Sequence, residues 1–148
     1  MKKVIAILVA ALAFVAVASA QPRALGIRGG WAGTVGAEVS YQHSLGSNFA
    51  EFDLGLYGHG FTLAGMYDII FANAGAVNFY VGPGVMLNLF NTDDGVNLAG
   101  GIAGQLGFEI ETGIPLNISV DWRPTCWLLG GHPYFAWQGF ALGLRYRF

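Results

Sequence analysis

The chain has 148 residues, of which 54% are hydrophobic, 11% are charged and 23 are glycine. A soluble domain of this size exposes much of its surface and carries about a quarter charged residues, so this composition argues against an outer surface that faces water. The formal net charge of −2 excludes a basic surface for nucleic acid, and the single cysteine, Cys126, excludes an internal disulfide.

The first 20 residues have the pattern of a secretory signal peptide. Lys2 and Lys3 precede an apolar run over residues 4–17, which ends at the small residues 18–20. This run is shorter than the roughly 20 residues of a membrane-spanning helix, so cleavage after Ala20 is expected rather than a retained anchor. The sequence therefore divides into a signal peptide over 1–20 and one domain over 21–148, whose net charge is −4 without the two lysines.

The domain is patterned for strands. The uncharged stretch 69–87 is nearly long enough for a membrane helix, but it contains Gly82-Pro83-Gly84, and its large apolar residues recur at every second position. The same period of two recurs in eight segments. These are 25–31, 35–42, 51–57, 61–71, 77–89, 96–111, 116–123 and 140–148.

Eight such segments predict an all-β fold, an eight-stranded antiparallel up-and-down transmembrane β-barrel. All the breaks between the segments except the last, 129–137, are short enough for hairpins, and an even number of strands closes without a free edge in lipid. Because one parity is bulky and the other is small or charged, we expect the bulky parity to face lipid and the small one to face a narrow lumen. The alternative is a soluble barrel or sandwich with the apolar parity inside.

The C-terminal segment 143–148 has a glycine, alternating apolar residues and a final aromatic residue. It resembles the signature by which outer-membrane barrels are recognised by the barrel-assembly machinery, carried here by Gly143, Tyr146 and Phe148. With the signal peptide and the eight strands, the chain resembles the small outer-membrane β-barrel proteins of the OmpA-transmembrane and OmpX type, especially the short forms of Bacteroidetes-type bacteria.

The resemblance implies a place in the cell envelope of a Gram-negative cell. The chain would cross the periplasm, keep both termini there, and lie in outer-membrane lipid and lipopolysaccharide. It lacks the long, strand-extended outer loops typical of OmpX, so an adhesin role is not expected. Because no further domain follows Phe148 in this sequence, an OmpA-like tether to the cell wall is not expected either.

Charged residues of the inward parity predict a plugged lumen. Arginines of the first, seventh and eighth strands should face acids of the other strands across the bore and pair with them, because an unpaired buried charge is costly. The predicted network comprises Arg28, Glu38, Glu51, Asp53, Asp68, Glu109, Glu111, Asp121, Arg123, Arg145 and Arg147. The outer half of the lumen has mainly small residues, with Tyr57 and Met86, and has room for water or a small apolar ligand.

Aromatic residues near the two rims predict girdles at the membrane interfaces. The girdle residues are Trp31, Trp122, Trp127, Trp137, Tyr41 and Phe108. For the aromatic residues of the last loop, a saccharide-binding patch is the alternative. The histidines (His43, His59 and His132) lack metal-ligand spacing, and His43-Ser44 has no third catalytic partner, so no metal, cofactor or catalytic site is expected.

Three functions fit these features. The favoured one is an integral, non-enzymatic outer-membrane barrel with a charge-plugged, narrow lumen. The alternatives are a narrow, porin-like channel or carrier for a small solute, and a lipid-modifying enzyme of the outer membrane.

Overall fold

The computed structural model describes residues 22–58 and 60–148, so the predicted signal peptide and His59 lie outside the described residues. The described chain consists of β-strands joined by turns and loops. The strands are β1 (Pro22–Trp31), β2 (Val35–Leu45), β3 (Asn48–Tyr57), β4 (Gly60–Ala74), β5 (Val77–Thr92), β6 (Gly95–Glu111), β7 (Leu116–Trp122), β8 (Thr125–Leu129), β9 (Tyr134–Ala136) and β10 (Phe140–Arg147). No helix in this part of the chain is long and apolar enough to cross a bilayer.

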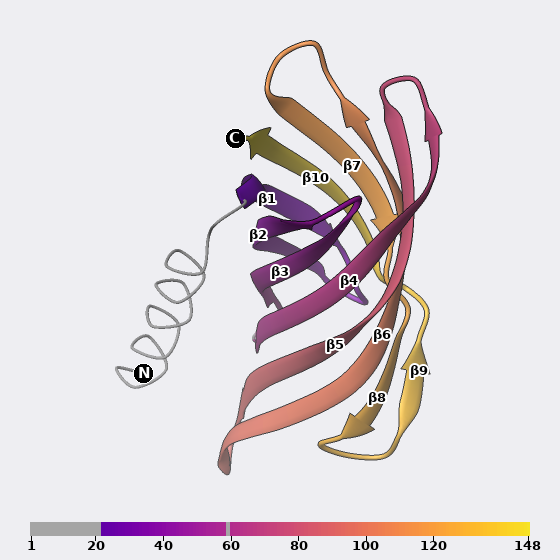
Figure 1. The fold of residues 1–148 in the computed structure, drawn as a ribbon. Coiled ribbons are helices and arrows are strands. Elements are labelled where there is room, and N and C mark those ends of the chain that lie inside the picture. Colours follow the sequence, from indigo (N-terminus) through magenta and orange to yellow (C-terminus); the bar gives the residue numbers. More distant parts are fainter. Residues whose placement is uncertain (1–21, 59) are drawn as a thin grey trace.

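The strands form a closed, antiparallel, up-and-down barrel (Figure 1). Each strand from β1 to β6 pairs with the next along the chain, and β10 pairs with both β7 and β1. β7 and β8 are two parts of one barrel strand, interrupted at Arg123 and Pro124, and β9 and β10 are two parts of the last. The ladder continues through both interruptions, because Gly104 N donates to Pro124 O (3.0 Å) and Arg123 N donates to Gly139 O (2.6 Å). The prediction of an eight-stranded antiparallel barrel is confirmed.

The outer wall is apolar and the interior is polar. Ile27, Leu56 and Leu142 are 63%, 55% and 59% exposed on the outer wall, whereas the side chains of Arg145 and Glu51 are fully buried inside. Buried polar and charged side chains outnumber buried apolar ones among the described residues. The alternative of a barrel with its apolar parity inside is therefore wrong.

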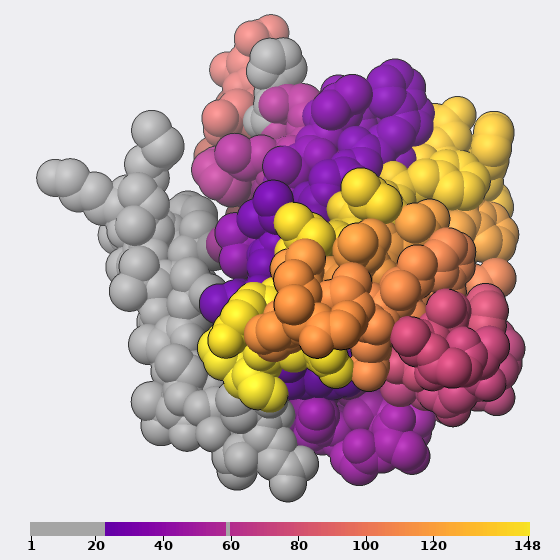
Figure 2. Space-filling model, turned by 90° about the horizontal axis from the view of Figure 1, so that it is seen from above, coloured from indigo at the N-terminus to yellow at the C-terminus, as the bar shows by residue number. Residues whose placement is uncertain are grey.

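The two ends of the barrel differ in height. At one end the two termini of the barrel meet, where Phe148 N donates to Arg23 O (3.2 Å); Figure 2 shows the molecule from this end. At the other end, β1 to β4 stop at short turns, whereas β5 and β6 stay paired as far as Thr92 and Gly95.

The expectation that strand-extended outer loops are absent is therefore wrong. β5 and β6 have 16 and 17 residues, and the predicted break 129–137 contains β9, which pairs with β8 as a second extended hairpin. The β5–β6 hairpin ends in a tight turn followed by Gly95 with a positive φ of 123°, and the β8–β9 hairpin ends in a short bend that contains Gly130 with a φ of 92°. The barrel therefore has a high wall over β5, β6, β8 and β9 and a low wall over β1 to β4.

Candidate functional site: a buried charge network and an adjoining cavity

Long charged side chains fit inside this narrow barrel because their neighbours are small. A Cβ on Gly143 would collide with Ser119 Oγ and would lie 2.9 Å from Arg145 Nη1. A Cβ on Gly26 would collide with the backbone of β10 in the same way. The glycines of the inward parity thus provide the volume that the arginines fill.

The centre of the network crosses the bore from the last strands to β3. Arg145 Nη2 lies 3.1 Å from Glu51 Oε2, and Arg123 Nη2 lies 2.9 Å from Glu51 Oε1. Arg123 also forms an ion pair with Asp53. Charges brought out of water are stabilised only when such pairing is supported by further hydrogen bonds, so the surrounding groups matter as much as the pairs.

Two serine hydroxyls hold the guanidinium group of Arg145 in place. Ser40 Oγ on β2 accepts from Arg145 Nε (2.9 Å), and Ser119 Oγ on β7 accepts from Arg145 Nη1 (2.7 Å). All three side chains are fully buried. The arginine is therefore fixed by partners on three other strands, including Glu51 on β3.

Arg28 pairs with acids on the same side of the barrel rather than across the bore. It is directly opposite Glu38 in the β1–β2 ladder and forms ion pairs with Glu38 and Asp121. Arg28 Nε also donates to Asp121 Oδ2 (3.2 Å). The predicted division into a basic wall and a facing acidic wall is thus wrong for this residue, because its acidic partners lie beside it.

Buried amides connect the remaining acids to the network. Gln105 Nε2 donates to Asp68 Oδ2 (3.1 Å) and to Glu51 Oε1 (3.3 Å), and its Oε1 accepts from Arg123 Nε (2.7 Å). Gln42 Nε2 donates to Glu51 Oε2 (3.0 Å). Asp68 thereby joins the network through an amide instead of an arginine.

A further layer lies near the terminal end. Arg23 forms an ion pair with Glu109 and donates to Gln42 Oε1 (2.8 Å), while its guanidinium carbon lies 4.3 Å from the ring centroid of Phe49. Phe49 packs edge-on against Tyr80, with ring centroids 5.3 Å apart. At the rim, Arg147 Nη1 lies 3.0 Å from Glu111 Oε2, and both side chains are about one third exposed.

Arg23 is not among the residues predicted for the charge network. Strict alternation puts Arg23 on the same side as Leu25, facing outward. The β1–β2 register shifts between Pro22 and Ala24, and this irregularity turns Arg23 inward. The inward direction of Phe49 could have been predicted from alternation, because Phe49 shares the parity of the inward residue Glu51.

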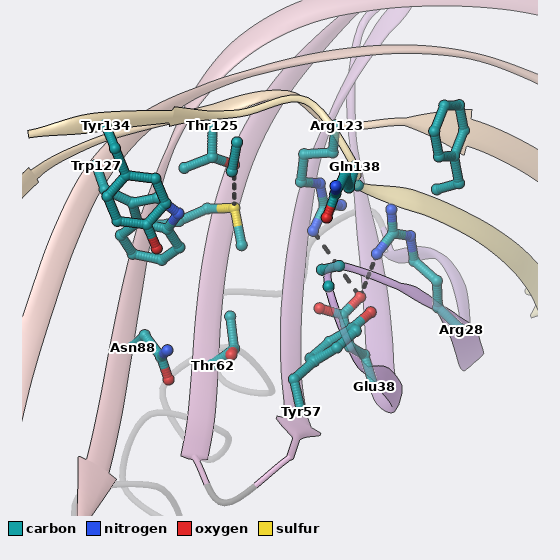
Figure 3. A pocket seen from close by; sticks show the side chains of 16 residues that line it. Arg28, Glu38, Tyr57, Thr62, Asn88, Arg123, Thr125, Trp127, Tyr134 and Gln138 are labelled. Carbon is teal, nitrogen blue, oxygen red and sulfur yellow. Dashed lines mark hydrogen bonds and ion pairs between the residues drawn. The ribbon is translucent and has the colours of Figure 1, made fainter.

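Beyond the network, towards the end away from the termini, lies a cavity of about 280 Å³ (Figure 3). Its floor is formed by Arg28, Glu38 and Arg123. Its sides include Tyr57, Thr62, Met86, Asn88, Trp127, Tyr134 and Gln138. A second hollow of about 340 Å³ shares Asn88, Trp127 and Tyr134 with the first and continues under the β8–β9 hairpin.

The prediction that Trp127 belongs to an outer aromatic girdle is wrong. Its side chain packs against Met86 and other apolar residues of the interior and lines the cavity (Figure 3). The physical reason is parity, because the inward direction of Arg123 continues through Thr125 to Trp127 across the interruption at Pro124. Position near a rim does not decide which way a side chain points.

The other predicted girdle residues lie on the outer wall. Trp31 and Trp137 are 51% and 57% exposed at the cavity end, where Trp122 Nε1 donates to Trp137 O (2.6 Å). Tyr41 and Phe108 are half-buried near the terminal end. Of the terminal signature, Gly143 faces inward, whereas Tyr146 and Phe148 face outward with ring centroids 5.5 Å apart.

The described histidines, His43 and His132, take no part in the network. His43 Nδ1 is 3.0 Å from the hydroxyl of Tyr41, and His132 lines the second hollow. Within residues 22–58 and 60–148, no group of three or more His, Cys, Asp or Glu side chains is arranged to hold a metal ion.

No family model matches the sequence, and neither curated proteins nor solved structures give a significant match.

Proposed function

We propose that this protein is an integral outer-membrane β-barrel of a Gram-negative cell, without enzymatic activity, whose lumen is closed by the buried charge network. It belongs, on this proposal, with the small barrels of the OmpA-transmembrane and OmpX type. Export by the signal peptide and insertion by the barrel-assembly machinery would bring it into contact with outer-membrane lipid and lipopolysaccharide.

The observation that carries the proposal is the distribution of side chains across the barrel wall. Large apolar residues cover the outside of every barrel strand, while the ionisable residues of the strands are mostly inside. Such a surface is stable in lipid, where every backbone group is paired within the closed sheet, and is poorly suited to water. Aromatic residues towards both ends of the outer wall fit the two membrane interfaces.

The filled terminal half of the lumen supports a closed barrel over a channel. Arg145, Glu51, Gln42 and Gln105 are buried and linked across the bore. Steady passage of ions would require these bonds to separate. Steady conductance in planar bilayers would favour a channel instead. Changed lipid A mass spectra in cells that express the protein would reveal a lipid-modifying enzyme.

The direct test of the membrane environment is an arginine scan at two depths on the outer wall. Leu144 lies midway along β10, and Leu144→Arg should cost about 2–4 kcal/mol in lipid and abolish insertion into vesicles. The matched control, Val35→Arg, is at the rim beside a turn, where the same charge should cost about 0–1 kcal/mol. The readouts are the shift in gel migration on heating and recovery in the membrane fraction.

If the outer wall faced water, Leu144→Arg would leave folding unchanged and raise solubility. Equal behaviour of the two variants, or recovery of the parent protein in the soluble periplasmic fraction, would overturn the proposal.

A further inference from the structure

We infer that the cavity above the charge network binds a single neutral sugar ring, as a free monosaccharide or as the end of a glycan. This inference goes beyond the proposed function, since neither membrane insertion nor a closed lumen names a ligand. Sugar binding depends only on the cavity. It can therefore be disproved while the membrane proposal stands, and the membrane proposal can be disproved while sugar binding stands.

The size of the cavity restricts the ligand. At about 280 Å³ the cavity itself lies at the lower limit for small-molecule sites, which favours one small ring within it, and the adjoining hollow of about 340 Å³ gives space for the rest of a glycan. It is lined on several sides by groups that form hydrogen bonds. These are the side chains of Arg28, Glu38, Tyr57, Thr62, Asn88, Arg123 and Gln138. So many donors and acceptors around a small volume suit a ligand with several hydroxyl groups.

One wall of the cavity is aromatic. Trp127 and Tyr134 lie side by side in Figure 3, across the cavity from Arg28 and Glu38. The face of an aromatic ring carries partial negative charge and attracts weakly positive C–H groups, which one face of a pyranose ring presents. An aromatic wall opposite a polar floor therefore matches the two chemical aspects of a sugar.

The charge of the floor favours a neutral ligand over an acid. Arg28 is paired with Glu38 and Asp121, and Arg123 with Glu51 and Asp53. An added carboxylate would meet arginines whose charge is already compensated and acids that repel it. A hydroxyl group needs no surplus charge.

Hydrogen-bonding capacity beside the cavity is incompletely used. Arg123 is 4% exposed, and within residues 22–58 and 60–148 its Nη1 has no hydrogen-bond partner, since Glu38 Oε2 is 3.9 Å away. On the side of the cavity, Asn88 Oδ1 is likewise buried without a donor in this part of the chain. Buried polar atoms without partners are costly, and a small rotation of either side chain toward a ligand hydroxyl would remove that cost, which an apolar ligand of the same size would not.

The test uses Trp127 as a reporter. The chain has four tryptophans, so Trp31→Phe, Trp122→Phe and Trp137→Phe together leave Trp127 alone. Titration of the refolded barrel with glucose, galactose or N-acetylglucosamine should change its fluorescence saturably, with a dissociation constant on the order of a millimolar for at least one sugar. The matched reporter keeps only Trp31, which is half exposed on the outer wall, and should not respond.

Two other probes separate the alternatives, glucuronate for an acid and cyclohexanol for an apolar ring. Each should bind at least about tenfold more weakly than the best neutral sugar. Asn88→Leu keeps the volume but removes the amide, and should weaken sugar binding about tenfold or more. Asn91→Leu, on the same strand but not lining the cavity, should leave it unchanged.

Saturation-transfer NMR on the unsubstituted protein with the same probes gives a second measurement if the triple variant does not fold. Absence of saturable binding for all three sugars, or binding of glucuronate or cyclohexanol as tight as that of the best sugar, would overturn the inference.

Discussion

The two halves of the barrel interior are built on the same strands and behind the same apolar wall, yet one is filled and the other is hollow. The terminal half contains long side chains that reach across the bore, such as Arg145, Glu51 and Gln105. In the cavity half, the inward positions carry Thr62, Ala64, Ala103 and Thr125, and their short side chains leave a space of about 280 Å³.

Whether the interior of a narrow barrel is filled or hollow depends on the length of its side chains and on the presence of partners that can pair with them. An arginine inside requires an acid within reach and a glycine or serine beside it, as Arg145 has Glu51, Gly143 and Ser119. Where small residues follow one another, the bore stays open to a ligand. The terminal half is thus expected to determine stability, and the cavity half to determine binding.

The largest effect should come from Arg145→Ala in the terminal half. Without Arg145 the buried Glu51 would keep only Arg123 as its remaining arginine partner, so the free energy of unfolding should fall by about 3–5 kcal/mol. Denaturant unfolding in detergent or vesicles measures it. Planar-bilayer recordings should show no steady conductance for the parent and passage of small cations for the variant, whose bore keeps its acids.

Two controls sharpen this test. Leu144→Ala on the outer wall should lower stability modestly and leave conductance unchanged. Arg147→Ala removes a pair that is about one third exposed, and should cost about 0–1 kcal/mol. A parent barrel that conducts steadily, together with an Arg145→Ala variant of undiminished stability, would disprove the plug and make the channel the better proposal.

A smaller effect is expected from a methyl group added at adjacent rungs of the β1–β10 pair. Gly143→Ala would crowd Ser119 and Arg145 and should cost about 1–3 kcal/mol of unfolding free energy. Gly29→Ala on the outer wall has its nearest new neighbour, Gly36 O, at 3.8 Å and should be neutral. Equal stability of the two variants would show that the terminal half has room for an added methyl group at Gly143.

The last comparison removes one hydroxyl group from each half of the interior. Ser119→Ala removes an acceptor from the buried Arg145 and should cost about 1–3 kcal/mol, the penalty for a buried donor left without a partner. Thr62→Val in the cavity half removes a hydroxyl that lines the cavity and bonds to no side chain among residues 22–58 and 60–148, and its effect should stay within about 0.5 kcal/mol. A larger loss for Thr62→Val would mean that the hollow half also carries the stability of the barrel.

Sequence alternation was sufficient for the barrel and for the inward direction of most charges. It was sufficient because outward-facing and lumen-facing sites alternate along any straight strand, so Arg145 and Leu144 separate by parity alone. Alternation failed for two residues that lie next to an irregularity in their strand. Arg23 turns inward at a register shift, and the inward direction of Trp127 is set by Arg123 on the far side of an interruption.

Pairing inside the barrel could not be read from the sequence. Partners of Arg28 and Arg145 depend on the height at which each side chain enters the bore, and that height depends on register between strands. The amides of Gln42 and Gln105 were missed because they carry no charge, although they donate hydrogen bonds to two acids of the network, Glu51 and Asp68.

The placement of Arg145 on β10 has a consequence for the order of folding. Its hydrogen-bond partner Ser40 precedes it by 105 residues, and Glu51 lies on β3, so one of the two arginines that compensate this acid is on the last strand to be synthesised. Glu51 cannot be fully paired in a sheet that is still open. Closure of the barrel and completion of its charge network are therefore one event. Contacts so distant along the chain form slowly, which makes docking of β10 the step expected to limit the rate of folding.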